Sequence, residues 1–334
     1  MTGREQRYAM LLRAYPHAYR DERGDELLGT LLDSSASQGI VRNIGDAIDL
    51  VLHGLQVRAG LTGDRYAGRV LAMAAFPGFV MAATLAVVAF VFGEWVPTLT
   101  HQPIRLGFGP FMTMAPVLYL LWVLGALFVL ARIRFQRPVA IICVLATVSF
   151  VPISDALRYG RPPMILLAVL ISLGLPSVLA PPPAYSHTPR VRSLVVAAVV
   201  VATTLSLLSR VGGPRYTLSG VFYVGGLREL ATWMPVIAVA GLVLISCALV
   251  MRRRDLAGAL AVLILPWTFA GVENPIGFSI LTTRLPTTTV SINTGLCVLL
   301  AGGLLVGWIA DLRRPRGSGL GSSGGLDGSL NLES

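Results

Sequence analysis

Long apolar stretches alternate with short polar segments along most of the chain, and a polar segment of roughly 66 residues precedes them. Eight stretches contain no Asp, Glu, Lys, Arg or His, and they approach or exceed the length of about 17 residues that a membrane-spanning helix needs. Their approximate bounds are 70–92, 109–131, 138–154, 163–180, 193–209, 231–251, 256–272 and 289–310. The pattern predicts an all-α polytopic bundle over residues 67–312 with about eight spans. Because several stretches are short, the predicted range is six to eight.

The predicted spans carry prolines but no ionisable side chains. Pro77, Pro116, Pro176 and Pro266 fall inside them, where neighbouring helices can satisfy the carbonyls that proline leaves unpaired. Proton-coupled pumps and many ion transporters place charged groups in the bilayer, because such groups are costly there and are kept for function. The absence of charge therefore argues against ion coupling.

The first 66 residues have the periodicity of short amphipathic helices. Apolar positions with helical spacing occur in residues 4–15, 17–34 and 41–58, and Pro16 separates the first two helices. We expect a small cytoplasmic three-helix domain over residues 1–66. A unit of this size is marginally stable alone, so we expect it to dock against the membrane or a partner.

Part of this segment carries a family resemblance. The run Tyr15-Pro16-x-x-Tyr19-Arg20-x-x-Arg23-Gly24-x-Glu26-Leu27 is followed by Leu31-Leu32-Asp33 and later by Asp46-Ala47-Ile48-Asp49-Leu50-Val51. It resembles the N-terminal HAAS-type and permease-prefix domains of actinobacterial multi-pass membrane proteins, over about residues 5–60. The resemblance implies a cytoplasmic helical adaptor that works with regulators or ABC-type permeases, and it implies no catalytic residue. The chain lacks the large extracytoplasmic domain of FtsX-like permeases, which puts a permease role in doubt.

The same motif gives the predicted partner-binding residues. They are Tyr15, Pro16, Tyr19, Arg20, Arg23 and Glu26. A structural interpretation stands beside this one. The two tyrosines would cover the core of the helical unit, and the arginines would pair with nearby carboxylates on a solvated face.

The charge distribution predicts the orientation in the membrane. The chain has a net charge of +10, but residues 1–66 carry eight Arg against nine Asp and Glu, so the excess lies in the loops between spans. With the N-terminus inside, the inner loops hold eleven Arg and the outer loops seven, and Arg252, Arg253 and Arg254 form the densest cluster. Inner loops are generally the more basic ones, so both termini are predicted to be cytoplasmic. We expect contact with lipid headgroups and none with nucleic acid.

Sequence signatures of catalysis and metal binding are missing. The four His have no paired spacing, and Cys143, Cys247 and Cys297 lie in apolar stretches, where we expect them to pack between helices. No phosphate loop or G-x-S-x-G elbow occurs. Carboxylates beside predicted spans have nearby arginines, and we expect interfacial ion pairs such as Asp155 with Arg158 and Asp311 with Arg313. The sequence thus predicts no enzyme, cofactor or metal site.

The final segment, residues 313–334, is rich in Gly and Ser and is predicted to be a flexible tail. Arg without Lys is typical of a high-GC bacterial genome, which indicates the bacterial inner membrane. The favoured hypothesis is a membrane adaptor or signalling protein that recruits a cytoplasmic partner, such as a regulator, an ATPase or a larger assembly. The alternative is a permease subunit for an apolar or lipid-like substrate, energised by a separate ATPase. The sequence leaves a homo-oligomer open.

Overall fold

The computed structural model describes residues 10–35, 50–94, 111–131, 135–181, 240–270 and 287–313, apart from residues 52 and 112. This part of the chain is built of helices and contains no β-strand. The prediction of an all-α protein is confirmed for these ranges. The predicted span over 193–209 and the predicted tail lie outside them.

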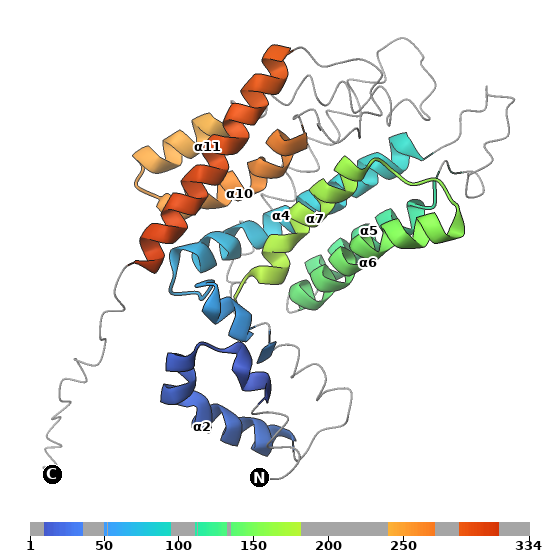
Figure 1. Cartoon of the computed structure of the whole chain (residues 1–334). Helices are drawn as coiled ribbons and strands as arrows, with labels where there is room; N and C mark the ends of the chain where they lie inside the picture. The colour runs from blue at the N-terminus through green and yellow to red at the C-terminus, as the bar shows by residue number, and fades with distance from the viewer. Residues whose placement is uncertain are drawn as a thin grey trace, which may run out of the picture.

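A small helical unit stands at the N-terminal end (Figure 1). It comprises the 3-10 helix η1 (Leu12–Ala14) and helix α2 (His17–Ser35), and Val57, within the helical residues 53–58, packs against it. Tyr15 is extended, with ψ of 153°, which is the conformation that the following Pro16 imposes. Proline therefore ends η1 and lets α2 begin in a new direction.

Four long helices form the centre of the molecule. They are α4 (Tyr66–Gly93), α5 (Pro116–Ala131), α6 (Gln136–Leu157) and α7 (Met164–Leu179). Helix α4 packs against both α5 and α7, and α6 packs against α5 and α7. Phe76, Phe79, Tyr119, Trp122 and Leu170 fill the space between them and are almost fully buried. This cluster is the main hydrophobic core of the described residues.

Three further helices flank one side of α4 and α7. They are the helix Ala240–Val250, α10 (Arg254–Ala270) and α11 (Thr287–Leu312). Helix α10 contacts α4, α7 and α11, so it connects the flank to the centre. Helix α11 is the long red helix in Figure 1, and it crosses the start of α4.

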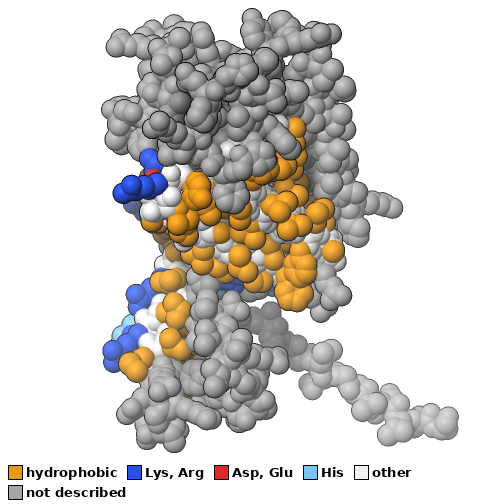
Figure 2. All heavy atoms as spheres, turned by 90° about the vertical axis from the view of Figure 1, so that its right-hand side faces the viewer, with side chains coloured by type: hydrophobic (Ala, Val, Ile, Leu, Met, Phe, Trp, Pro, Cys, Tyr) orange, Lys and Arg blue, Asp and Glu red, His pale blue; other side chains and the backbone are white. Residues whose placement is uncertain are grey.

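Three of the described helices are long and apolar enough to cross a membrane. They are Tyr66–Val91, Gln136–Leu157 and Thr294–Leu312, and shorter apolar helices accompany them. Large apolar side chains of α5 and α6, such as Leu120, Leu124 and Leu145, are more than half exposed. Figure 2 shows hydrophobic side chains gathered over one face of the bundle. Such a continuous apolar surface is stable in lipid and unfavourable in water.

The prediction that Pro116 lies within a span is wrong. The described residues before it, Phe111 and Thr113–Ala115, are not helical, and α5 begins at Pro116 itself. Proline suits the first position of a helix, because its missing N–H would have no helical acceptor there. Pro77, Pro176 and Pro266 do lie inside helices, as predicted.

Four helix ends lie on one side of the bundle, next to the N-terminal unit. Contacts join the start of α4 to the start of α10 and to the end of α11, while residue Gln56 contacts the end of α7. This arrangement fixes the relative directions of these four helices.

Candidate functional site

Tyr15, the first of the predicted partner-binding residues, lies in the core of the N-terminal unit. Its side chain is 1% exposed and clusters with Leu12, Leu50 and Val57. The ring of Tyr19 stacks on it, with 5.2 Å between ring centroids. Burial raises the pKa of Tyr15 to about 12, and the neighbouring phenol of Tyr19 contributes in the same direction. Tyr15 is therefore part of the hydrophobic core of this unit.

The remaining predicted residues are progressively more accessible along α2. Pro16, Tyr19 and Arg20 are half-buried, whereas Arg23 and Glu26 are exposed. The first turn of α2 also carries a hydrogen bond of 2.7 Å between His17 and Asp21, and both residues are exposed. The predicted set thus divides into a tyrosine pair inside the unit and a charged outer face of α2.

A short connector, residues 53–65, joins the N-terminal unit to the bundle. On the N-terminal side, the Arg58 guanidinium donates to the carbonyl oxygens of Arg13 at 2.7 Å and of Tyr15 at 3.3 Å. These carbonyls belong to the end of η1, where no helical N–H follows because Pro16 interrupts the chain. The Arg58 guanidinium therefore donates to the Arg13 carbonyl, to which Pro16 has no N–H to offer.

The same connector is bonded to the bundle. The side-chain amide of Gln56 donates to the carbonyl of Leu179 at 2.8 Å, and the indole of Trp308 donates to the carbonyl of Ala59 at 3.0 Å. Gly60 turns the chain with φ of +68°, and a Cβ there would lie 2.8 Å from Leu312. The connector is thereby fixed to the ends of α7 and α11.

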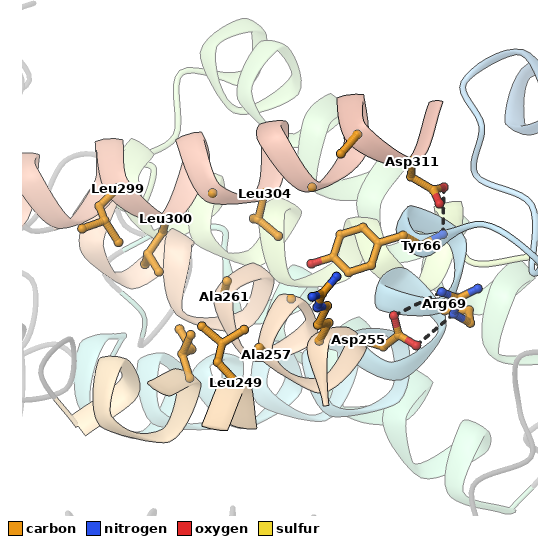
Figure 3. A pocket seen from close by; sticks show the side chains of 16 residues that line it. Tyr66, Arg69, Leu249, Asp255, Ala257, Ala261, Leu299, Leu300, Leu304 and Asp311 are labelled. Carbon is orange, nitrogen blue, oxygen red and sulfur yellow. Dashed lines mark hydrogen bonds and ion pairs between the residues drawn. The ribbon is translucent and has the colours of Figure 1, made fainter. Parts of the chain in front are cut away.

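Charged side chains link the adjoining helix ends (Figure 3). Arg69 of α4 pairs with Asp255 of α10 at 2.9 Å. The Asp311 carboxylate accepts from the backbone N–H of Tyr66 at 3.0 Å, and the guanidinium of Arg65 donates to the Asp311 carbonyl. Carboxylate at the N–H groups of a helix start is favourable, because these donors have no partner inside the helix.

The ion pairs expected between sequence neighbours are replaced by other contacts. Asp155 pairs with Arg161 at 3.2 Å, while Arg158 ends α6 with φ of 57°. Asp311 receives its contact from α4 rather than from Arg313. Proximity along the chain does not identify these partners, because α6 ends in a left-handed turn at Arg158 and Asp155 pairs beyond it with Arg161.

Two buried polar contacts were missed by the sequence reasoning. Glu94, directly after α4, is fully buried and accepts from both the backbone N–H and the hydroxyl of Thr113. Gln136 donates to the hydroxyl of Ser177, which in turn donates to the carbonyl of Ala75. An acidic residue at the very end of an apolar stretch was the available indication for Glu94.

The cysteines differ from one another in their surroundings. Cys143 is buried between helices as expected, but Cys247 is exposed and Cys297 is half-buried. The expectation that all three pack between helices is wrong for Cys247. Over the described ranges, no three His, Cys, Asp or Glu side chains come together as metal ligands.

The chain was compared with family models, curated proteins and solved structures. No family model, no curated protein and no solved structure matches the chain. The class that its own residues define is an α-helical protein with helices able to cross a membrane.

Proposed function

We propose that the chain is an integral membrane adaptor, in which a cytoplasmic N-terminal unit recruits a protein partner and holds it against the helical bundle. The observation that carries this proposal is the double attachment of the connector. Arg58 bonds it to the N-terminal unit, while Gln56 and Ala59 bond it to the bundle. A unit attached in this way presents its outer face at a fixed position relative to the membrane.

The charge at this end of the bundle supports a cytoplasmic location. Arg58, Arg252, Arg253, Arg254 and Arg313 are all exposed close to the helix ends beside the N-terminal unit. Exposed arginine next to spans is enriched on the cytoplasmic side. In a bacterium this corresponds to the inner membrane with both termini inside.

The outer face of α2 is the proposed recruitment surface. Arg23 and Glu26 are exposed there, one turn apart, and they carry opposite charges. Opposite charges in this arrangement select a partner of complementary charge and fix its orientation. They contribute less to the binding affinity. The partner class that fits is a cytoplasmic regulator, an ATPase or a larger assembly.

The proposal is tested by crosslinking and affinity purification of the full chain from its native host. The informative variant is Arg23→Glu combined with Glu26→Arg, because both side chains are exposed and the core tyrosines stay intact. Arg158→Glu, at the far ends of the helices, is the matched control. We expect the control and the unaltered chain to capture the same cytoplasmic protein and the double variant to lose at least about tenfold of it, a loss of about 1.4 kcal/mol.

Equal capture by all three chains would overturn the assignment of the recruitment surface. Capture of the same ATPase subunit by a chain that lacks residues 10–35 would favour the permease alternative instead. A second variant, Gln56→Leu, tests the attachment itself. We expect about fivefold to tenfold faster hydrogen exchange in α2, because one hydrogen bond between the connector and α7 contributes about 1 kcal/mol.

A further inference from the structure

A groove opens between α10, α11 and the helix Ala240–Val250, and it ends at the start of α4 (Figure 3). Its volume of about 350 Å³ lies in the range of small-molecule sites, which is about 300–1,000 Å³. Apolar side chains line most of its length, including Leu249, Leu299, Leu300 and Leu304. The groove is therefore a concave apolar surface on the flank of the bundle.

Small residues give the groove its depth. Ala257 and Ala261 of α10 and Gly303 of α11 leave room between the two helices. A Cβ added to Gly303 would meet no atom within 4 Å, so the space above this glycine is open. Side chains of neighbouring helices do not fill it in the described part of the chain.

The end of the groove beside α4 is polar. Tyr66, Arg69, Arg254, Asp255 and Asp311 line it. Arg69 is paired with Asp255, and Asp311 accepts from the Tyr66 N–H. Arg254 is exposed, and among the described residues no carboxylate pairs with it. The polar end therefore presents one available guanidinium, with Arg252 and Arg253 adjacent in the chain.

The length of the groove corresponds to one leaflet of a bilayer. Leu299 and Asp311 mark its two ends on α11, and twelve residues of helix rise by about 18 Å. Half of a hydrocarbon core is about 15 Å thick. An apolar chain that starts at the polar end would thus reach close to the middle of the membrane.

We propose that this groove binds a membrane phospholipid, with one acyl chain along α10 and α11 and the phosphate at Arg254. A guanidinium matches phosphate in charge and geometry, and the apolar lining matches a chain rather than a water-soluble ligand. Anionic headgroups are preferred, because the arginines of this end act together. This site is independent of the recruitment surface on α2.

The experiment uses the full chain in phosphatidylcholine vesicles that contain a phosphatidylglycerol with a photoactivatable acyl chain. Crosslinked peptides are identified by mass spectrometry. Gly303→Leu places a side chain in the groove at a position where an added Cβ meets no atom within 4 Å. Gly302→Leu is its control, since Gly302 has the same open space but does not line the groove. Arg254→Gln removes the phosphate contact, and Arg252→Gln is the control for charge alone.

We expect labelling at residues of α10 and α11 that line the groove. Gly303→Leu should lower it at least about fivefold and Gly302→Leu should leave it unchanged. For Arg254→Gln, the concentration of unlabelled phosphatidylglycerol that halves the labelling should rise about fivefold. One basic residue near an anionic membrane surface contributes about 1 kcal/mol, which corresponds to this factor. Equal labelling in the two glycine variants would overturn the site. Competition by free glycerol phosphate as effective as that by the lipid would overturn the role of the acyl chain.

Discussion

Glu94 accepts hydrogen bonds from both the backbone N–H and the hydroxyl of Thr113, and both residues are buried. Glu94 follows the last turn of α4, while Thr113 precedes the first turn of α5, and its hydroxyl also accepts from the N–H of Ala115. A buried carboxylate is tolerated when such donors surround it. The contact therefore joins the end of one helix to the beginning of the next.

Removing the hydroxyl of Thr113 should destabilise the bundle. Thr113→Val leaves the Glu94 carboxylate with a donor missing, and we expect a loss of about 1–3 kcal/mol. Thr113→Ser, which keeps the hydroxyl, should lose less than half of this. Thermal unfolding in detergent measures both, and Thr84→Val is the control because its hydroxyl bonds only within its own helix. A Tm for Thr113→Val equal to that of the control would contradict the role of this contact.

Gly78 allows α4 and α7 to approach each other closely. A Cβ at this position would lie 2.6 Å from the carbonyl oxygen of Leu173, which is backbone and cannot rotate away. We expect Gly78→Ala to destabilise the protein by about 1–3 kcal/mol. Gly302→Ala, with open space around it, should change stability by less than about 1 kcal/mol and in the stabilising direction. Thermal unfolding of Gly78→Ala and Gly302→Ala in the same detergent measures both effects. Equal Tm values for the two variants would contradict the close approach at Gly78.

Tyr15 should make the N-terminal unit sensitive to alkali. The folded unit keeps the phenolic proton up to about pH 12, whereas an unfolded tyrosine loses it near pH 10. The stabilisation is therefore complete below pH 10 and is lost as the pH rises toward 12. An ultraviolet titration should show a phenol ionising near pH 12, and the contribution of this phenol should be absent in Tyr15→Phe. Tyr159→Phe should retain it, and loss of the step in both variants would refute the assignment.

Cysteine labelling can establish the orientation of the helix ends. Replacing the three native cysteines by Ala provides the background for Asp64→Cys, Arg313→Cys and Tyr159→Cys. The first two lie beside the N-terminal unit, and Tyr159 follows the far end of α6. In intact cells, we expect an impermeant maleimide to label only the cysteine at position 159. Labelling at position 64 or 313 without cell lysis would reverse the predicted orientation.

Apolar length and proline chemistry predicted much of the helical framework. The bounds of α6 and α7 agree with the apolar stretches to within a few residues, because each stretch ends at polar or proline positions. The start of α5 was missed because hydrophobicity continues through residues 111–115 although Pro116 limits the helix. Apolar composition alone cannot distinguish a helix from the bends and turn that precede it at residues 113–115.

Burial within the candidate site depends on contacts between distant segments, which a local sequence pattern does not show. The motif around Tyr15 identifies residues that lie close together at the start of α2. It could not show that Leu50 and Val57 cover Tyr15, since these residues are more than thirty positions away. No local pattern indicates that Arg69 pairs with Asp255, because the two residues are 186 positions apart in the sequence. The groove beside α11 depends on packing between helices that are far apart in the sequence, although Gly303 and Gly307, four positions apart in α11, both line it.

The bond between Trp308 and Ala59 spans 249 positions of the chain. During synthesis at about 5–20 residues per second, Ala59 leaves the ribosome about 10–50 s before its partner exists. The N-terminal helices can form early, but their contacts with the bundle are incomplete until α11 has been inserted. An N-terminal unit that is bonded to the bundle through Ala59 and Trp308 thus shows that α11 has already folded against the other helices.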